Sequence, residues 1–313
     1  MGADLLKILT LDGGGSKGVF SLGVLFEIEA KLKQPLTEYF DCFYGTSTGA
    51  IIAASLSLGK SIEEIKSLYL KKMSRIMGHC SKRKRTNELK MVLEEEFGDK
   101  TFQDCRKYLG VVTSSLDERK PKVFKSSADG AHGRKETFTP GFGFTIAEAV
   151  LASCAAAPFF EKVKLRSLDG SHNFTLIDGG FSANNPTLFS LIDATKAFGK
   201  DETDILIINV GTGSFPHKTS LPFLMTDCFN RMTQHFIPDI MEINANTTGL
   251  IAEMLFKDVK ILRIDKTFTH PSLKTNFLEN DVSKLEKIFG QGRTTFGEFE
   301  QKFDQIKANL NHK

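Results

Sequence analysis

Tryptophan is absent from the chain, and 4 tyrosines stand against 27 phenylalanines. Cysteine is also scarce. The 313 residues contain 5 cysteines, an odd number, and no two of them have the CxxC spacing. This usage argues against a disulfide framework and against a metal site built from thiolates. We therefore expect the protein to work in a reducing compartment.

Long hydrophobic runs are missing as well. No stretch reaches the roughly 18 consecutive apolar residues that indicate a membrane-spanning helix. The first residues, MGADLLKILTL, are interrupted by Asp4 and Lys7 and are too short for a signal peptide. Leu6 occupies the position where the myristoylation pattern needs Ser or Thr. These absences predict a cytoplasmic protein.

Neither sign of charge dominates the sequence. Lys and Arg number 41 and Asp and Glu 38, so the formal net charge is only +3. This balance does not indicate a protein dedicated to nucleic acid polymers. Hydrophobic residues make up 41% and charged residues 25%, as in an ordinary soluble globular protein. The length permits one large α/β domain or two smaller ones.

Apolar runs typical of strands alternate with stretches typical of amphipathic helices. The expected strands are Leu5–Leu11, Cys42–Tyr44, Gly110–Ser114, Lys122–Lys125, Phe174–Ile177, Ile205–Val210 and Val259–Ile264. The expected helices include Val19–Lys33, Thr145–Ala156, Pro186–Phe198, Val282–Phe289 and Thr295–Leu310, and Ser61 with Glu64 forms a capping box for another. Such alternation predicts a mostly parallel central sheet with helices on both faces.

Two segments depart from this alternation. Ser126–Phe144 is rich in Gly, Ser and charge and is predicted to be a surface loop, either functional or decorative. Phe215–Phe256 is rich in Met and Phe at helix-like spacing. Those side chains can line an adaptable channel for acyl chains or can pack in the core, and both interpretations stay open.

The first chemical motif is Gly45-Thr46-Ser47-Thr48-Gly49, which fits G-x-S-x-G. An apolar strand is expected before it and a helix of small residues after it, and this is the context that the motif requires. A serine on such a sharp turn has strained backbone geometry and lies at a helix N-terminus. Gly45 and Gly49 let neighbouring strands and a substrate approach. The pattern indicates a nucleophilic serine.

The second motif is the glycine-rich segment Asp12–Gly18, DGGGSKG, between the first strand and the first helix. Its amides carry no side chains in front of them and can converge on an oxyanion or a phosphate. The segment also fits G-x-G-x-x-G. A dinucleotide site, however, expects an acidic residue at the end of the second strand, whereas Asp41 precedes that strand. Val19 after Gly18 excludes a P-loop.

The third motif is Asp178-Gly179-Gly180, directly after the expected strand Phe174–Ile177. Asp-Gly pairs are common in turns. Here we expect the carboxylate to project from the carboxyl edge of the sheet, where the site residues of open α/β sheets gather. An esterase needs a base at such a place, and Asp178 is the candidate.

In this order, the three motifs resemble the signature of the patatin-like phospholipases. The segments Ala152–Phe160 and Asn209–Ser214 resemble further parts of that family. The resemblance spans about residues 5–215 and implies a three-layer α/β/α fold. We expect residues 1–313 to form a single domain, in which 216–313 is the part that varies within the family.

The resemblance implies a lipid acyl hydrolase that cleaves carboxylic ester bonds of membrane phospholipids through an acyl-enzyme. Ser47 is then the nucleophile and Asp178 the base of a Ser-Asp dyad. The amides of Gly13, Gly14 and Gly15 form the oxyanion hole. The supporting positions are Asp12, Lys17, Gly18, Gly45, Gly49, Gly179 and Gly180. This scheme requires no metal and no cofactor.

The resemblance also implies partners. These are a phospholipid and a membrane with which the protein associates peripherally. Basic residues concentrate at Lys71, Lys72, Arg75, Lys82, Arg83, Lys84, Arg85 and Lys90. This basic cluster either meets anionic headgroups or forms a solvated face. Bacterial relatives include effectors activated by cyclic nucleotides, so the cluster is also a candidate site for such an activator. Lys17 either faces a lipid phosphate or lies in solvent.

Two other functions stay open. An α/β-hydrolase with a Ser-Asp-His triad needs a histidine after the acid in chain order. The seven histidines are His79, His132, His172, His217, His235, His270 and His312. Against this alternative, Asp12 opens the glycine loop where HGGG loops have a histidine. The second alternative is a catalytically idle lipid-binding protein, against which the presence of both Ser47 and Asp178 argues.

Overall fold

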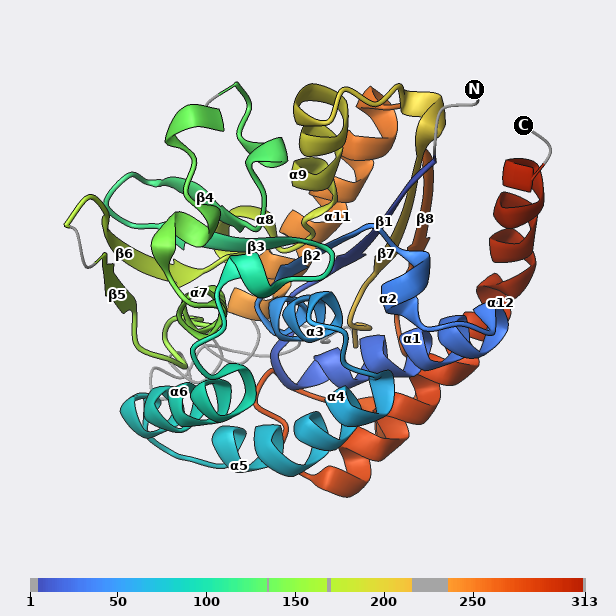
Figure 1. Ribbon diagram of the computed structural model, residues 1–313. Helices are drawn as coiled ribbons and strands as arrows, with labels where there is room; N and C mark the ends of the chain where they lie inside the picture. The colour runs from blue at the N-terminus through green and yellow to red at the C-terminus, as the bar shows by residue number, and fades with distance from the viewer. Residues whose placement is uncertain (1–4, 134, 168–169, 216–235, 312–313) are drawn as a thin grey trace.

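The structure is a computed structural model that describes residues 5–133, 135–167, 170–215 and 236–311. Its centre is an 8-stranded sheet with the order β5-β6-β3-β2-β1-β7-β8, in which β4 pairs with β3 (Figure 1). The strands are β1 Leu6–Leu11, β2 Cys42–Thr46, β3 Tyr108–Ser115, β4 Lys120–Lys125, β5 Val163–Arg166, β6 Asn173–Asp178, β7 Ile205–Val210 and β8 Lys260–Ile264. The five strands from β3 to β8 in this order run parallel, and the pairs β3–β4, β3–β6 and β5–β6 are antiparallel. The prediction of a mostly parallel sheet is confirmed.

Helices cover both faces of this sheet (Figure 1). They are α1 Gly18–Leu32, α2 Leu36–Tyr39, α3 Thr48–Ser57, α4 Ile62–Leu68, α5 Ser74–Met77, α6 Lys82–Phe97, α7 Ile146–Ser153, α8 Gly180–Ala183, α9 Thr187–Ile192, α11 Ile237–Leu255 and α12 Val282–Asn311. The predicted capping box of Ser61 and Glu64 is present at the start of α4.

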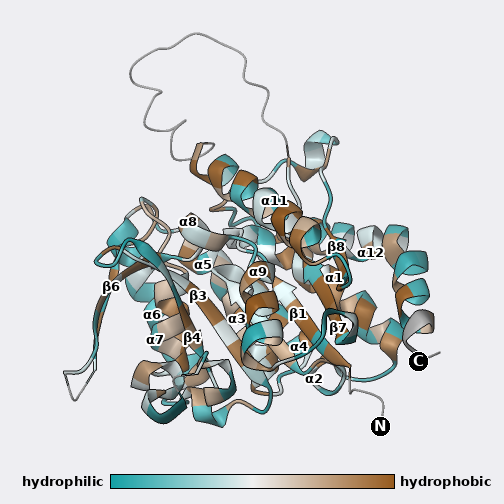
Figure 2. Cartoon of the chain, turned by 90° about the horizontal axis from the view of Figure 1, so that it is seen from above, coloured by the Kyte–Doolittle hydropathy of each residue, from teal (hydrophilic) through white to brown (hydrophobic). Residues whose placement is uncertain are grey.

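Alternate residues of the central strands belong to two separate cores, because successive side chains of a strand point to opposite faces. On β1, Leu9 and Leu11 pack into the larger core with α1, α3 and α12. Ile8 packs into a smaller core with Leu191 of α9 and Ala252 of α11. The central strands β1, β3 and β7 are accordingly mostly hydrophobic, whereas the helices outside them mix hydrophilic and hydrophobic residues (Figure 2). The molecule therefore has the three α/β/α layers that were predicted.

Several elements differ from the prediction, and the short helices α2 and α8 are among those that were not expected. The segments Val282–Phe289 and Thr295–Leu310 are one continuous helix, α12, and the glycines between them do not break it. Gly292 lies against α1, where an added Cβ would be only 2.1 Å from the Phe20 carbonyl oxygen. The glycine therefore permits close packing of two helices and does not mark a turn. Helix α6 and the edge strand β5 were not predicted at all.

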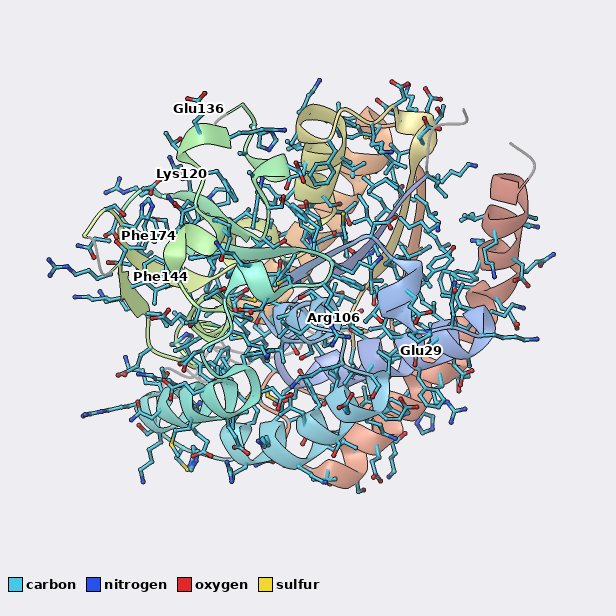
Figure 3. The ribbon with its side chains drawn as sticks, in the orientation of Figure 1. Glu29, Arg106, Lys120, Glu136, Phe144 and Phe174 are labelled. Atoms are coloured by element: carbon cyan, nitrogen blue, oxygen red, sulfur yellow. The ribbon has the colours of Figure 1, made fainter. Side chains whose placement is uncertain are left out.

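The loop Ser126–Phe144 is anchored at both ends, as far as the described residues show. Near its end, Phe144 packs beside Phe174 of β6, with ring centroids 6.0 Å apart (Figure 3). Near its start, His132 Nε2 lies 2.7 Å from Asp193 Oδ1, which also accepts a hydrogen bond from Lys125 Nζ at 2.6 Å. The described part of the loop is thus packed against β6 and against Asp193, the residue that follows α9.

Candidate active site

Ser47 and Asp178 meet because two strands end at the same place along β3. Strand β2 pairs with the first part of β3, where Thr46 lies opposite Val112. Strand β6 pairs antiparallel with the last part of β3, where Asp178 lies opposite Thr113. Since these two β3 residues are adjacent, the C-terminal ends of β2 and β6 meet end to end.

Asp178 ends an antiparallel strand, which differs from the position expected for it. We expected the carboxylate to project from the carboxyl edge that parallel strands share. Strand β6 instead runs antiparallel to β3, so Asp178 arrives from the opposite direction. The backbone amide of Asp178 donates to the Ala155 carbonyl at 3.0 Å, and that of Gly179 to the Ser153 carbonyl at 3.3 Å. The segment after α7 therefore fixes the end of β6.

Ser47 occupies a sharp turn between β2 and α3. Its φ is 53° and its ψ is −123°, a left-handed conformation that costs free energy for a residue with a side chain. The surrounding hydrogen bonds hold it there: the Ser47 amide donates to Ser153 Oγ at 2.8 Å, and Ser153 Oγ donates to the Val112 carbonyl at 2.6 Å. The side chain faces Asp178, with Ser47 Oγ donating to Asp178 Oδ2 at 2.6 Å.

The glycines on either side of Ser47 are required by close packing. A Cβ on Gly45 would lie 2.2 Å from the Gly49 carbonyl oxygen, and one on Gly49 would lie 2.3 Å from the Leu11 carbonyl oxygen. Both neighbours are backbone atoms that cannot move aside cheaply. These glycines therefore let α3 start directly against β1, with Ser47 at its N-terminus.

Asp178 is fully buried, which decides its ionisation. Burial raises the pKa of its carboxyl group from 3.8 to about 7, because the charged form loses water. Hydrogen bonds oppose this rise: Ser47 Oγ donates to Oδ2, and the Gly180 amide donates to Oδ1 at 2.7 Å. A carboxylate with a pKa near 7 suits a general base at neutral pH.

The glycine loop lies beside this pair but offers fewer free amides than predicted. The Gly13 amide already donates to the Asn184 carbonyl at 3.1 Å. The amides of Gly14 and Gly15 have no acceptor among the described residues. Gly15 has a φ of +59°, which favours glycine. Of the three amides predicted for an oxyanion hole, only those of Gly14 and Gly15 are therefore available in this conformation.

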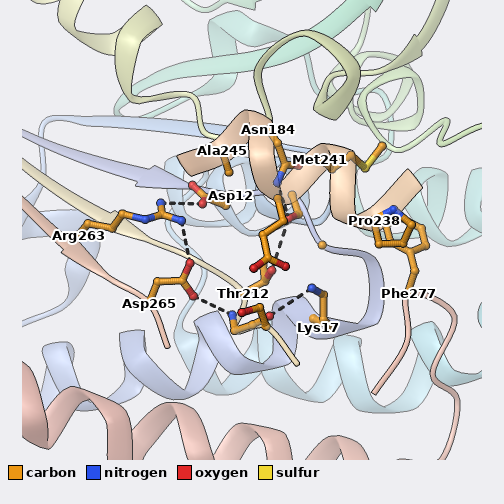
Figure 4. Close-up of a pocket in the computed structure, with 15 residues that line it drawn as sticks. Asp12, Lys17, Asn184, Thr212, Pro238, Met241, Ala245, Arg263, Asp265 and Phe277 are labelled. Atoms are coloured by element: carbon orange, nitrogen blue, oxygen red, sulfur yellow. Dashed lines mark hydrogen bonds and ion pairs between the residues drawn. The ribbon is translucent and has the colours of Figure 1, made fainter. Parts of the chain in front are cut away.

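Asp12, which opens the glycine loop, is held by residues that the sequence did not point to. Arg263 Nη1 of β8 donates to its carboxylate at 2.8 Å (Figure 4). Asn209 Nδ2 of β7 donates to the same carboxylate, also at 2.8 Å. Burial raises the pKa of Asp12 to about 6, and the charge of Arg263 opposes that rise. Asn209 lies in a segment already compared with the family, whereas Arg263 lies in the C-terminal third, where no motif marked it.

A pocket opens beside the glycine loop (Figure 4). Its lining includes Gly13, Gly14, Lys17, Asn184, Thr212, Pro238, Met241 and Phe277. The Lys17 ammonium group donates to the Gly213 carbonyl at 3.2 Å. Lys17 therefore binds the turn after β7. The sequence analysis had expected it to face either a lipid phosphate or solvent.

The segment Phe215–Phe256 supports neither of its two interpretations as a whole. Residues 216–235 lie outside the described residues. In α11, Met241 is buried next to Gly180, but other apolar side chains on this helix face solvent. Ile243, Leu250 and Met254 are 64%, 57% and 63% exposed. The described part therefore combines one core-facing side with an exposed apolar side, which we call the α11 apolar face.

The basic cluster is less uniform than its sequence suggests. Arg85 is buried, and its guanidinium donates to the Phe159 and His79 carbonyls. Lys72, Arg75 and Lys90 form ion pairs with Glu95, Glu88 and Glu94 respectively. Lys71, Lys82, Arg83 and Lys84 are exposed and have no acidic partner among the described residues. Only these four remain for an anionic surface or ligand.

None of the histidines in the described residues forms a hydrogen bond with Ser47. His79 lies near Glu88, His132 near Asp193, His172 against Phe174, and His270 against Ser272. His217, His235 and His312 lie outside the described residues. The direct bond between Ser47 and Asp178 places the acid where a triad would have its histidine.

The described parts of the chain hold no group of three or more His, Cys, Asp or Glu side chains arranged to bind a metal ion. Within the same parts, none of the helices has the length and apolar character needed to cross a membrane.

Several known proteins are similar to this chain in sequence, and a solved structure is similar to it in fold. Residues 9–190 match the family described as patatin-like phospholipase. A cUMP-AMP-activated phospholipase of Escherichia coli is 44% identical over 295 residues, which cover 94% of this chain and 91% of that protein. A cGAMP-activated phospholipase of Vibrio cholerae is 28% identical, over 92% of this chain and 89% of that protein.

Among solved structures, VipD from Legionella pneumophila resembles this chain with a TM-score of 0.52. The match covers 96% of this chain and 67% of that one, and at 14% identity it shows the shared fold alone. The family match to residues 9–190 and the 44% identity to the Escherichia coli protein are the stronger findings. By both of them, this chain belongs to the patatin-like phospholipase family.

Proposed function

We propose that the protein is a lipid acyl hydrolase that cleaves carboxylic ester bonds of membrane phospholipids, with Ser47 as the nucleophile and Asp178 as its base. The observation that carries this proposal is the 2.6 Å hydrogen bond from Ser47 Oγ to the buried Asp178 carboxylate. It joins a serine on a strained turn to a group that can accept its proton. Membership in a phospholipase family supports the choice of substrate.

The reaction follows from this geometry. Serine at its ordinary pKa is a weak nucleophile, so Asp178 takes the Oγ proton as Ser47 attacks the ester carbonyl carbon. The electron pair of the carbonyl moves to its oxygen. The free amides of Gly14 and Gly15 stabilise that oxyanion, and loss of one such donor typically costs about 10²–10³ in rate. The alcohol then leaves with the proton from Asp178, and the acyl group stays on Ser47 until water releases it.

We further propose that a cyclic dinucleotide activates the protein. The Escherichia coli relative is activated by cUMP-AMP and the Vibrio cholerae relative by cGAMP, and both matches extend over most of either chain. The test is hydrolysis with no nucleotide, with cUMP-AMP and with cGAMP. Equal rates under all three conditions would refute activation and leave the hydrolase assignment intact.

We also propose that the protein associates peripherally with membranes. Two surfaces support this: the α11 apolar face, and the exposed cations Lys82, Arg83 and Lys84 at the start of α6. Apolar side chains gain free energy by entering the boundary between headgroups and acyl chains, and cations gain it near anionic lipids.

The central experiment incubates the protein with mixed phospholipids and identifies the products by mass spectrometry. We expect free fatty acids and lysolipids from the wild type, and almost none from Ser47→Ala. Asp178→Asn should lose nearly as much, and the double variant little more, because residues that act as a unit are not additive. Independent, multiplicative losses would show that another base activates Ser47.

Two further measurements separate the alternatives. Replacing each histidine singly should leave most activity, whereas a fall of about 10³ in one well-folded variant would indicate a triad. A fluorophosphonate probe should label the wild type at Ser47. An unlabelled, folded wild type would favour the idle lipid-binding protein.

A further inference from the structure

Asn184, at the end of α8, is bound closely to the glycine loop. Its backbone carbonyl accepts the Gly13 amide at 3.1 Å, and its side-chain Nδ2 donates to the Gly13 carbonyl at 3.1 Å. Its own amide donates to Asn244 Oδ1 of α11 at 2.8 Å. Because a carbonyl only accepts hydrogen bonds, the NH₂ end of the Asn184 side chain must face Gly13. The orientation of this amide is therefore set by its partners.

The other end of the side chain, Asn184 Oδ1, is buried and has no donor among the described residues. Two glycines locate it. A Cβ on Gly13 would lie 2.4 Å from Asn184 Oδ1 and 3.1 Å from Ser47 Cβ. A Cβ on Gly180 would lie 2.9 Å from Asn184 Oδ1 and 3.0 Å from Asp178 Oδ1. This oxygen therefore shares the space around both glycines with the Ser47 side chain and the Asp178 carboxylate.

A buried acceptor without a partner is unfavourable, so its presence beside reacting groups calls for a donor that arrives during the reaction. The other polar groups already have roles: the Ser47 amide is bound to Ser153 Oγ, and the Gly14 and Gly15 amides are donors themselves. Water has two O–H donors, and hydrolysis of an acyl-enzyme needs one water held close to the base.

We infer that Asn184 Oδ1 accepts a hydrogen bond from the water that hydrolyses the acyl-enzyme, and so orients that water between Ser47 and Asp178. This inference rests on the proposed function, because it needs an acyl group on Ser47. It makes Asn184 a catalytic residue of the second half of the reaction alone.

The water oxygen forms a bond to the acyl carbon, one water proton passes to the Asp178 carboxylate, and the other stays hydrogen-bonded to Asn184 Oδ1. The carbonyl electron pair moves to the oxygen held by the Gly14 and Gly15 amides. When the intermediate collapses, the bond from carbon to Ser47 Oγ breaks and Asp178 returns its proton to Oγ. The carboxylic acid leaves, and the enzyme is restored.

Asn184→Ala tests the inference with a p-nitrophenyl ester in stopped-flow kinetics. Acylation releases nitrophenol and needs no water, so it should lose only the effect of the missing hydrogen bond to Gly13 and should slow less than deacylation does. Deacylation should slow by about ten- to hundredfold, the effect of one lost hydrogen bond in the transition state. An initial burst of nitrophenol should follow, and mass spectrometry should find the acyl group on the Ser47 peptide. Equal slowing of both steps, with no adduct, would overturn the inference and leave Asn184 a role in holding Gly13 only.

A second variant keeps the test valid if Asn184→Ala is poorly folded. Asn184→Asp retains an acceptor at the Oδ1 position but loses the donor to Gly13. Its ratio of deacylation to acylation, measured at alkaline pH where Asp178 is ionised, should lie closer to the wild-type ratio. A ratio as low as that expected for Asn184→Ala would contradict a role for the acceptor.

Asn185→Ala is the matched control. Asn185 is also buried, but its side chain bonds Asn209 Oδ1 and the Thr187 amide. Its loss should lower stability without accumulating an acyl adduct, and an adduct would attribute the effect to local packing and overturn the inference. If the folded wild type neither reacts with a fluorophosphonate at Ser47 nor hydrolyses the ester, the proposed function fails and this inference with it. A reactive wild type with an unchanged ratio in Asn184→Ala overturns the inference alone.

Discussion

At the scale of single residues, the buried carboxyl group of Asp178 links catalysis to stability. Burial favours the protonated form of this group. In the mechanism that we propose, the ionised form is the one that accepts the Ser47 proton. With a pKa of about 7, Asp178 changes from the protonated to the ionised form within the pH range of ordinary buffers. The same residue therefore predicts two opposite responses to pH.

Activity should rise with pH. Since Asp178 must be ionised to act as a base, kcat/KM should increase about tenfold per pH unit below its pKa of about 7 and level off above it. The measurement is hydrolysis of a soluble ester, which avoids changes in vesicle binding. A profile that is already flat at about pH 5 would mean that a different group, or a much more acidic Asp178, limits the reaction.

Stability should change in the other direction. A raised pKa means that the contribution of Asp178 is fully present below about pH 4 and is lost as pH rises through about 7. Asp178→Asn, which stays neutral, should therefore be the more stable protein at about pH 8, by at most about 4 kcal/mol. The two proteins should converge near pH 4 in urea titrations. A wild type that stays the more stable at alkaline pH would contradict the assignment.

At the scale of elements, the sequence predicted best where local chemistry decides the structure. The strand–turn–helix around Ser47 and the capping box of Ser61 follow from residues that are neighbours in the chain. The position of Asp178 depends on the antiparallel pairing of β6 with β3, which no local pattern specifies. The separation of Val282–Phe289 from Thr295–Leu310 was wrong for the same reason, because Phe20, against which Gly292 packs, lies far away in the sequence.

The contact between α1 and α12 gives a paired prediction. Gly292→Ala places a Cβ 2.1 Å from the Phe20 carbonyl oxygen, so we expect a loss of about 1–3 kcal/mol from overpacking. Gly297→Ala, in the same helix with nothing within 4 Å, should gain about 0.5–1 kcal/mol from helix propensity. Urea unfolding midpoints measure both. Similar shifts in the two variants would show that the helices do not approach so closely.

The two membrane surfaces should differ in their response to salt. In a Ser47→Ala background, replacing Ile243, Leu250 and Met254 by Gln should weaken binding to zwitterionic vesicles more than tenfold at any salt concentration, because the lost contacts are apolar. Replacing Lys82, Arg83 and Lys84 should matter only for anionic vesicles at low salt, since a Debye length of about 8 Å screens these charges at physiological ionic strength.

Vesicle flotation measures this binding. Met91 of α6, which is also exposed, supplies the control Met91→Gln, and this variant should bind as the parent protein does. If the triple variant of α11 binds zwitterionic vesicles normally, the α11 apolar face is not a membrane surface.

At the scale of the whole molecule, the C-terminal third completes the glycine loop. Arg263 pairs with Asp12, the Phe277 carbonyl accepts the Ser16 amide at 3.1 Å, and Asn244 holds Asn184. All three donors and acceptors lie beyond residues 9–190, the part that matches the family. The three motifs could be recognised from the sequence because they lie in the matched part. Arg263, Phe277 and Asn244 belong to no recognised motif, so the sequence did not predict their contacts.

This arrangement predicts that residues 1–215 alone are not an active unit. Such a fragment keeps Ser47 and Asp178 but leaves Asp12 buried without its cation, and breaking a buried ion pair typically costs about 3–5 kcal/mol. It also loses α12, which packs along α1. We expect no cooperative unfolding transition and no fluorophosphonate labelling. Labelling of the fragment at the wild-type rate would show that the C-terminal third is a separate addition.

The end-to-end meeting of β2 and β6 has a consequence for the way the chain is made. Ser47 leaves the ribosome 131 residues before Asp178, and the two become partners only after β6 has joined β3. Until then the serine has no base and the reactivity of an ordinary alcohol. By the proposed mechanism, an incomplete chain therefore cannot hydrolyse the lipids of the cell that synthesises it, and the protein becomes active only once β6 has paired with β3.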